Sequence, residues 1–399
     1  MSLHIKQLVE TCVEDAGNKR RGQRRAAEIL RQGLSGKNPT IEAKDVSFKA
    51  LAEAMVVPEG ETLNTFIWDT DFREAVDSSA FPIAVKYVTD SVAIPAYEMG
   101  MAGADALITD RGVHSQAGKD DIIKIPGVLS DLWPDRVFRG MPYTEGNLME
   151  KYAEIQVATF GRIIGFTKYA LLADDGGAML RDAVTLAENA GQHRHQFIVE
   201  SAADLAITAT GQAADTNLYY EGTRRIVYSS DHSSLEEGSQ TNDNLGTGSL
   251  TTAPTTALKT WYSQMALMKD LWGRPVNPLL GRKQLLVPQS LYIDAQVVTA
   301  SPFQSDNMNN GITPRLFSSL EIIPSVVLDG FTGTTSTVNW YAGNFPKAHW
   351  WYWGWPFKVD VQSAGSDADF ERDEALRIKE SYRGGCGYVD YRYVYKSVN

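Results

Sequence analysis

Residues 174–205 read DDGGAMLRDAVTLAENAGQHRHQFIVESAADL. Their apolar residues recur mainly at three- and four-residue steps, the period of one face of an α-helix. The members of this series are Leu180, Ala183, Val184, Ala187, Ala190, Ile198, Ala202 and Leu205. The pattern is interrupted only by the polar stretch 192–196, and it predicts a helix of about 30 residues, about 45 Å long. A helix of that length predicts a structural spine on which the rest of the fold is built.

Two polar features of this stretch have alternative explanations. Asp174 and Asp175 precede the helix, where carboxylates cap the first N–H groups and favour the positive end of the helix dipole. We therefore interpret them as caps and not as a pair of catalytic acids. His193 and His195 would point about 200° apart on a helix, so they cannot share a metal ion, and we predict solvated or interface histidines.

The N-terminal third predicts helices followed by an arm. Residues 3–32 predict a helix in two pieces, because Gly17 and Asn18 interrupt the pattern, and residues 46–56 predict a short helix. Residues 57–80 lack a clear period and are predicted to be an extended arm that needs a neighbour. A basic segment, 19–31, contains one acid, Glu28, and six cations: Lys19, Arg20, Arg21, Arg24, Arg25 and Arg31. It is either a solvated helix face or a contact for nucleic acid or an acidic partner.

A strand-rich region follows. Residues 81–97 are mixed apolar and should join the core, whereas 108–145 are rich in Gly, Pro and Asp and predict a long excursion. The chain returns through 152–172, which the apolar and aromatic residues mark as strand. A two-stranded excursion without its own core is poorly stable alone. We therefore expect it to lie on another subunit.

The C-terminal half mixes helices and strands. Residues 206–254 predict loop, 255–271 a helix, 285–288 a buried strand and 289–300 a short helix. The last segment, 375–396, predicts a hairpin that turns at Gly384-Gly385. The fold class predicted for the whole chain is therefore α+β.

Composition restricts the function. The formal net charge of −11 argues against a surface that wraps nucleic acid, since phosphate binding needs clustered Lys and Arg. No apolar run reaches the roughly 18 residues of a membrane span. Cys12 and Cys386 are the only cysteines, too few for a disulfide framework or a four-sulfur zinc site, and we expect reduced thiols.

The sequence contains no catalytic signature. No nucleophile elbow, phosphate loop or dinucleotide fingerprint is present, and Cys386 lies between glycines without a recognisable base. Asp231, Glu236 and Glu237 lie in a Ser/Gly-rich loop and are predicted to be solvated. We predict no catalytic residues, no metal site and no cofactor.

The aromatic run HWWYWGW at 349–355 is the most unusual local feature. We interpret it as a strand whose alternate rings fill the core while the others face a neighbouring subunit. The alternative is a stacking platform for sugars or bases.

Three segments, in order, resemble the HK97-fold major capsid proteins of tailed bacteriophages, and among them the head subunits of Mu-like phages. The first comprises MPYTE (141–145), FGRIIGFT (160–167) and ALLADD (170–175). The second comprises DLWGRPVNP (270–278), LLVP (285–288) and Leu291. The third comprises FERD (370–373), Leu376, Arg377, Glu380 and RGG (383–385). The resemblance covers residues 141–399, and residues 1–80 match only as a generic arm.

This resemblance implies a division of the chain into the parts of a capsid subunit. The parts are an N-arm (1–80), a segment leading into the P-domain (81–107), an E-loop (108–168), the P-domain spine helix (169–206), an A-domain (207–347) and closing P-domain strands (348–399). No long coiled-coil segment precedes the arm, so we expect no N-terminal maturation cleavage and a separate scaffolding protein. Some relatives crosslink an E-loop Lys to a P-domain Asn. Lys119 and Lys124 lie in the corresponding region, but no matching Asn is identifiable.

The resemblance also implies a structural function and not an enzymatic one. Copies would form hexamers and pentamers of an icosahedral shell that encloses double-stranded DNA without sequence-specific binding. The expected partners are the chain itself, a scaffolding protein, a portal and decoration proteins, with no membrane. The expected location is the virion capsid, assembled in the bacterial host cytoplasm. Two alternatives remain open, namely an encapsulin-like compartment shell and a ligand- or sugar-binding protein that uses the 349–355 aromatics.

Overall fold

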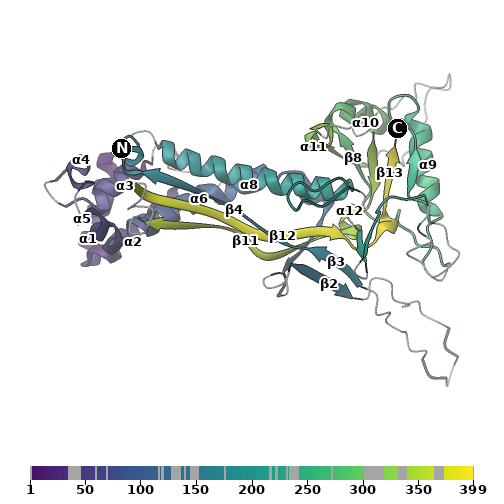
Figure 1. Cartoon of the computed structure of the whole chain (residues 1–399), viewed down its shortest axis with the longest axis horizontal. Helices are drawn as coiled ribbons and strands as arrows, with labels where there is room; N and C mark the ends of the chain where they lie inside the picture. The colour runs from purple at the N-terminus through teal and green to yellow at the C-terminus, as the bar shows by residue number, and fades with distance from the viewer. Residues whose placement is uncertain are drawn as a thin grey trace. The chain divides into compact units, whose positions relative to one another are not determined.

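The computed structural model in Figure 1 is a mixed helix-and-sheet structure, which confirms the predicted α+β class. It describes residues 2–34, 46–58, 61–68, 71–115, 117, 121–126, 136–138, 141–143, 152–174, 177–214, 218–220, 223–230, 232, 242–270, 273–300, 319–330, 339–363 and 373–398. In these residues, no helix is both long and apolar enough to cross a bilayer.

The chain forms two compact units. The first comprises residues 1–102, 159–193 and 356–383, and the second comprises residues 103–158, 194–355 and 384–399. Helix α8 (Ala178–Ala202) and strands β11 (His349–Ser363) and β12 (Glu374–Tyr388) contribute residues to both units.

The first unit is rich in helices. They are α1 (Ser2–Ala16), α2 (Lys19–Leu34), α3 (Phe48–Met55), α4 (Leu63–Phe66), α5 (Asp71–Ser78), α6 (Phe81–Gly100) and α7 (Lys168–Leu172). The predicted break at Gly17-Asn18 and the helix at 46–56 are confirmed. Gly17 has a φ of 61°, a left-handed conformation that glycine adopts without steric cost.

The extended arm predicted for 57–80 is wrong, because α4 and α5 occupy this segment. Leu63 and Phe66 are buried three residues apart, and Phe72 and Val76 are buried four apart. The rings of Phe66 and Phe72 meet edge to face at 6.0 Å. Two single-turn apolar repeats are too short to stand out as a period in the sequence, but each suffices for a short helix that packs on a core.

Asp174 caps α8 as predicted and also joins it to α3. Its Oδ1 accepts a hydrogen bond from the N–H of Met179 at 3.2 Å, and its Oδ2 accepts one from the N–H of Phe48 at 2.8 Å. The hydroxyl of Ser47, the N-cap of α3, donates to the Asp174 carbonyl. Helix α8 has 25 residues, five fewer than the sequence predicted, because it begins at Ala178 and ends at Ala202.

Three sheets are present in the described residues. One has the order β1-β11-β12-β4, in which β1 is Thr109–Val113 and β4 is Ala158–Thr167. A second, β2-β3-β5-β6, comprises Ile122–Pro126, Tyr152–Gln156, Leu218–Tyr220 and Thr223–Arg225. The third, β7-β13-β10-β8-β9, comprises Leu245–Thr247, Val394–Val398, Trp340–Gly343, Gln284–Pro288 and Glu321–Ser325.

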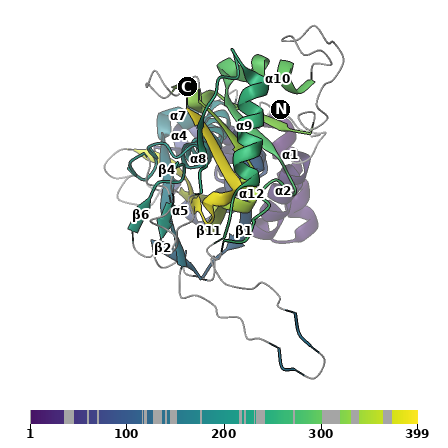
Figure 2. The ribbon, with the colours of Figure 1, turned by 90° about the vertical axis from the view of Figure 1, so that its right-hand side faces the viewer.

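The second unit has its core on the five-stranded sheet. Helix α9 (Pro254–Ala266) lies beside this sheet (Figure 2). Its Leu258, Trp261 and Met265 pack with residues of β8 and β10. Strand β8 is buried along its whole length, as predicted for 285–288. The remaining short elements are η2 (Ala104–Leu107), η3 (Gln289–Leu291), α10 (Tyr292–Ala300), α11 (Val326–Gly330), α12 (Phe345–Ala348) and η4 (Tyr391–Tyr393).

The hairpin predicted for 375–396 is wrong. Strand β12 continues without a turn through Gly384 and Gly385 to Tyr388. The two glycines are required by packing instead. A Cβ on Gly384 would lie 2.5 Å from the Trp351 ring, and one on Gly385 would lie 2.0 Å from the Gln156 carbonyl oxygen.

Candidate functional site

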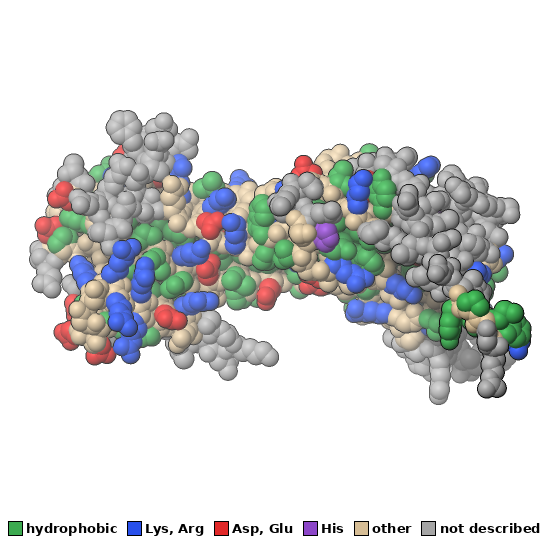
Figure 3. Space-filling view, turned by 90° about the horizontal axis from the view of Figure 1, so that it is seen from below, with side chains coloured by type: hydrophobic (Ala, Val, Ile, Leu, Met, Phe, Trp, Pro, Cys, Tyr) green, Lys and Arg blue, Asp and Glu red, His purple; other side chains and the backbone are tan. Residues whose placement is uncertain are grey.

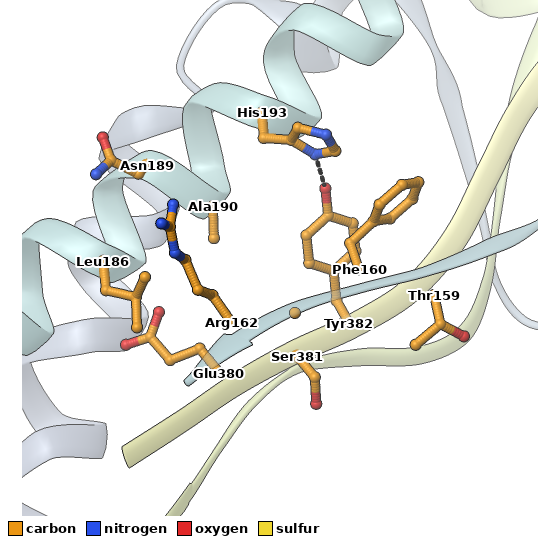
Figure 4. Close-up of a pocket in the computed structure, with 11 residues that line it drawn as sticks. Thr159, Phe160, Arg162, Leu186, Asn189, Ala190, His193, Glu380, Ser381 and Tyr382 are labelled. Atoms are coloured by element: carbon orange, nitrogen blue, oxygen red, sulfur yellow. Dashed lines mark hydrogen bonds between the residues drawn. The ribbon is translucent and has the colours of Figure 1, made fainter. Parts of the chain in front are cut away.

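A pocket of about 390 Å³ lies between β4, α8 and β12, and all of its lining belongs to the first unit (Figure 4). Strand β4 is the outer strand of its sheet, and Gly161 lets it run close to β12. A Cβ on Gly161 would lie 2.7 Å from the carbonyl oxygen of Glu380. The pocket therefore lies beside the strand that forms the edge of this sheet in the described residues.

One wall of the pocket is aromatic. Tyr382 is buried, its hydroxyl lies 2.8 Å from Nδ1 of His193, and the two rings are bridged by Phe160. The Phe160 ring centroid is 5.2 Å from that of Tyr382 and 4.9 Å from that of His193. Figure 4 shows this hydrogen bond and the three rings side by side.

The opposite wall contains a buried acid, Glu380. Its exposed fraction is 2%, and neither carboxylate oxygen has a hydrogen-bond partner among the described residues. Burial raises the pKa of Glu380 to about 8, because the low-dielectric surroundings disfavour its charged form. At neutral pH this side chain is therefore mainly a neutral acid held in a pocket.

No sequence motif marks Glu380 as a site residue, although the pattern of its strand carries a signal. Leu376, Ile378, Glu380 and Tyr382 are alternate residues of β12, and all four are buried. An acid in the apolar phase of a strand costs stability unless something compensates it. Such a position indicates a site, but the pocket around it is formed by residues from β4 and α8, which the strand alone does not reveal.

Both histidines of the His-x-His pair lie on α8 and are partly buried. His193 bonds Tyr382 in the pocket, while His195 belongs to the range of the second unit. In the part of the chain that the structure describes, no group of three or more His, Cys, Asp or Glu side chains is arranged to hold a metal ion.

Several predicted positions fall outside the described residues, namely Asp175, Lys119, Asp231, Glu236 and Glu237. Lys124, the other lysine considered for crosslinking, lies on β2. Its ammonium is 3.8 Å from the Glu154 carboxylate and 4.5 Å from the centre of the Tyr152 ring.

Both cysteines are buried free thiols. Burial raises the pKa of Cys386 to about 12, and its Sγ lies 3.9 Å from the carbonyl oxygen of Phe197, to which the thiol donates. The thiolate is the nucleophilic form of cysteine, so a thiol that stays protonated at neutral pH is inert.

The aromatic run 349–355 forms the start of β11, and its rings alternate as predicted. Trp351 and Trp353 are buried, whereas Trp350 and Tyr352 are partly exposed. The guanidinium of Arg194 lies over both buried rings, 4.4 Å from Trp351 and 4.3 Å from Trp353. The structural interpretation is therefore confirmed for the buried pair.

The partly exposed Trp350 lines a second hollow, of about 600 Å³, in the second unit. Its ring is already covered by the guanidinium of Arg111, which lies 3.8 Å from the ring centre. A ligand would have to displace this cation before it could stack on Trp350. This contact counts against the stacking-platform alternative.

The basic segment 19–31 lies on α2. Its six cations are all exposed, while Gly22, Gln23, Ala26, Ala27 and Leu30 are buried against the rest of the unit. Gln23 links the buried face of α2 to two other segments. Its Nε2 donates to the Met55 carbonyl at 3.1 Å, and its Oε1 accepts from the Ala80 N–H at 3.1 Å. Lys and Arg side chains gather at the left of Figure 3.

Comparison with known proteins connects this structure to viral shells. The family described as phage capsid protein matches residues 151–397. Among curated proteins, none matches this chain in sequence. Among solved structures, the capsid of cyanophage P-SCSP1u is similar over 74% of this chain and 86% of that chain, with 14% identity and a TM-score of 0.46. The capsid of Myoviridae phage XM1 is similar over 75% and 92%, with 12% identity and a TM-score of 0.43.

Proposed function

The chain belongs to a family of phage capsid proteins, and from this premise we propose that its copies close an icosahedral shell of hexamers and pentamers around double-stranded DNA. It is a structural protein, the major capsid protein of a bacteriophage, and not an enzyme. The observation that carries the proposal is the family match over residues 151–397, which is more than half of the 399 residues.

The fold we propose is the HK97 type, and we propose that the chain is related to the head subunits of Mu-like phages. In this proposal α1 to α5 form the N-arm (1–80), and residues 81–107 lead into the P-domain. Strands β1 to β4 lie in the E-loop (108–168), and α8 is the spine helix (169–206). The A-domain (207–347) contains α9 and β8, and β11 and β12 are the closing strands (348–399).

Exposed apolar side chains support self-association. On α10, Ile293 is 71% exposed and Val297 is 58% exposed, and residues four apart share one helix face. Val326, at the start of α11, is 69% exposed. Exposed apolar side chains that share one face, as Ile293 and Val297 do, are typical of surfaces that bind other proteins. We propose that this face of α10 contacts a second copy in the capsomer.

The remaining partners in the proposal are a scaffolding protein, a portal and decoration proteins, with assembly in the host cytoplasm. The acidic net charge of −11 would weaken adhesion of the shell to packed DNA. The exposed cations of α2 are the candidate contact for DNA or for the scaffolding protein.

Electron microscopy of the purified protein tests the function. The chain is expressed alone and together with its neighbouring phage genes, and the particles are imaged. Closed shells, or rings of six and five subunits, are expected. A monodisperse monomer or dimer under every condition would contradict the shell function.

A further inference from the structure

We propose that the pocket between β4, α8 and β12 receives a lysine or arginine side chain from a second copy of this chain, with Glu380 as its counter-ion. The inference rests on the proposed self-assembly and names one of its contacts.

The first support is the state of Glu380. It is 2% exposed, it lines the pocket, and its two carboxylate oxygens have no hydrogen-bond partner among the described residues. A buried polar group without a partner is costly, and native proteins almost always satisfy such groups. A leucine in this place would fill the same apolar position without the cost of burying a carboxyl group. The acid is therefore explained by a partner that arrives from outside the folded chain.

None of the polar groups next to Glu380 in the described residues pairs with its carboxyl group. His193 on α8 is engaged with the Tyr382 hydroxyl. Arg162 on β4 is exposed, and Figure 4 shows its stem passing beside Glu380 while its guanidinium lies near α8 and Asn189. The raised pKa of Glu380 has burial as its cause, with no cation lowering it. The carboxyl group is therefore uncompensated by the described residues of its own chain.

The walls of the pocket suit a long cationic side chain. Leu186 and Phe160 supply apolar surface for a methylene stem, as lysine and arginine stems prefer. The rings of Phe160 and Tyr382 stand beside the pocket, where aromatic faces attract cations. At about 390 Å³ the pocket has room for one such side chain.

Access comes along β4. This strand is the outer member of its sheet, and exposed residues dominate its length. A segment of another copy that runs beside this edge can direct a side chain over Gly161 into the pocket. In a closed shell of hexamers and pentamers the copies have similar surroundings, so one such contact can recur throughout the particle.

The test compares wild-type chain with Glu380→Gln, which keeps the shape of the side chain and removes its charge. We expect the concentration needed for assembly, measured by light scattering and sedimentation, to rise at least ten-fold. The melting temperature of the unassembled chain should be unchanged or higher, which separates lost docking from lost folding. Glu374→Gln is the matched control on the same strand, because Glu374 is already paired with Arg377 within the chain. It should assemble as wild type does.

A density map of the assembled shell identifies the occupant. A lysine or arginine of a second copy at the Glu380 carboxylate supports the inference, and an empty pocket, a free cation or Arg162 of the same chain there overturns it. Arg162→Met checks the last case, since it should assemble normally if the partner comes from another copy. Wild type that never assembles would remove the shell function and the inference together. Wild type and Glu380→Gln assembling at equal concentrations would remove the inference alone.

Discussion

Gly385 lies so close to Gln156 that a Cβ at position 385 would come within 2.0 Å of the Gln156 carbonyl oxygen. The two residues are 229 positions apart in the chain (385 − 156), and both belong to the second unit. The contact is between backbones, so no side-chain rotation can relieve it. Position 385 therefore requires glycine for packing.

Gly385→Ala should destabilise the protein, because the new methyl group forces two backbone segments apart. We expect a loss of about 1–3 kcal/mol, the usual cost of overpacking a rigid core. Urea unfolding measures it. Gly330→Ala is the control, since nothing lies within 4 Å of a Cβ there, and it should change stability little. Equal effects from the two variants would contradict the packing explanation.

Arg194→Lys should destabilise the second unit although it conserves charge. The Arg194 side chain is buried, its guanidinium lies over Trp351 and Trp353, and NH2 lies 3.7 Å from Asp105 and 3.9 Å from Asp110. An ammonium group cannot stack flat on two rings, so we expect a loss of about 2 kcal/mol and altered Trp fluorescence.

The exposed pair of Arg111 and Trp350 is the matched control for this substitution. Arg111→Lys also replaces a guanidinium that lies over a Trp ring, but at an exposed position. A cation–π contact there contributes about 0.5–1 kcal/mol. A larger loss at position 111 than at position 194 would show that burial does not strengthen the contact.

His349 should make the folded state sensitive to acid. It is fully buried, its Nε2 lies 2.9 Å from the Ser201 hydroxyl, and burial lowers its pKa to about 4 from an ordinary 6.5. Between these values the unfolded chain binds the proton and the folded chain does not. The free energy of unfolding is therefore unaffected by this proton above pH 6.5. It falls by about 3 kcal/mol as the pH decreases toward 4.

The measurement is urea unfolding of wild type and His349→Gln at several pH values from 7.5 to 4. The difference in unfolding free energy between the two proteins should shrink as the pH falls through this window. Glu380 acts in the opposite direction, since its raised pKa makes its contribution fall as the pH rises from about 4.5 to 8. A pH-independent difference between wild type and His349→Gln would show that this imidazole does not titrate on unfolding.

Ile293→Glu on α10 should block assembly without unfolding the chain. The side chain is 71% exposed in the single chain, so a charge costs little there, whereas burying that charge against another copy is costly. Sedimentation should show unassembled protein with a wild-type melting temperature. Ser263→Glu, an exposed position on α9 outside the proposed contact, is the control. Normal shells from Ile293→Glu would remove α10 from the proposed capsomer contact.

The elements that the sequence predicted correctly carry their signal locally. The break between α1 and α2 lies at Gly17, and Asp174 caps the start of α8. The hairpin prediction failed because Gly384 and Gly385 serve contacts with Trp351 and Gln156, which are distant in sequence. Turn chemistry and close packing both select glycine, and only the tertiary structure distinguishes them.

The candidate pocket could not be predicted from the sequence for a similar reason. The strand period marks Glu380 as buried, but its environment depends on residues such as Phe160 and His193, which lie 220 and 187 positions earlier (380 − 160, 380 − 193). The bond between His193 and Tyr382 likewise joins residues 189 apart. Chemistry that is assembled across such separations leaves no motif of adjacent residues.

The exposed cations of α2 should affect function and not folding. Arg20, Arg21, Arg24 and Arg25 are all exposed, whereas the helix is fixed by its buried face, in which a Cβ on Gly22 would lie 2.4 Å from Val13 Cα. Neutralising the four arginines to Gln should therefore shift the melting temperature by no more than a few degrees, since each surface change typically costs under about 0.5 kcal/mol.

The same variant should lose assembly with a scaffolding protein or retention of DNA. Arginine attracts the phosphates of DNA and the carboxylates of an acidic protein, and the variant removes four arginines. Removing four cations from a phosphate contact would reduce the dependence of log affinity on log salt by about 3 to 4. Arg181→Gln and Lys259→Gln, exposed cations on α8 and α9, are the controls for loss of surface cations elsewhere. Particle yield and packaged DNA are measured for each variant. Wild-type values for both quantities in the quadruple variant would leave these arginines as a solvated helix face.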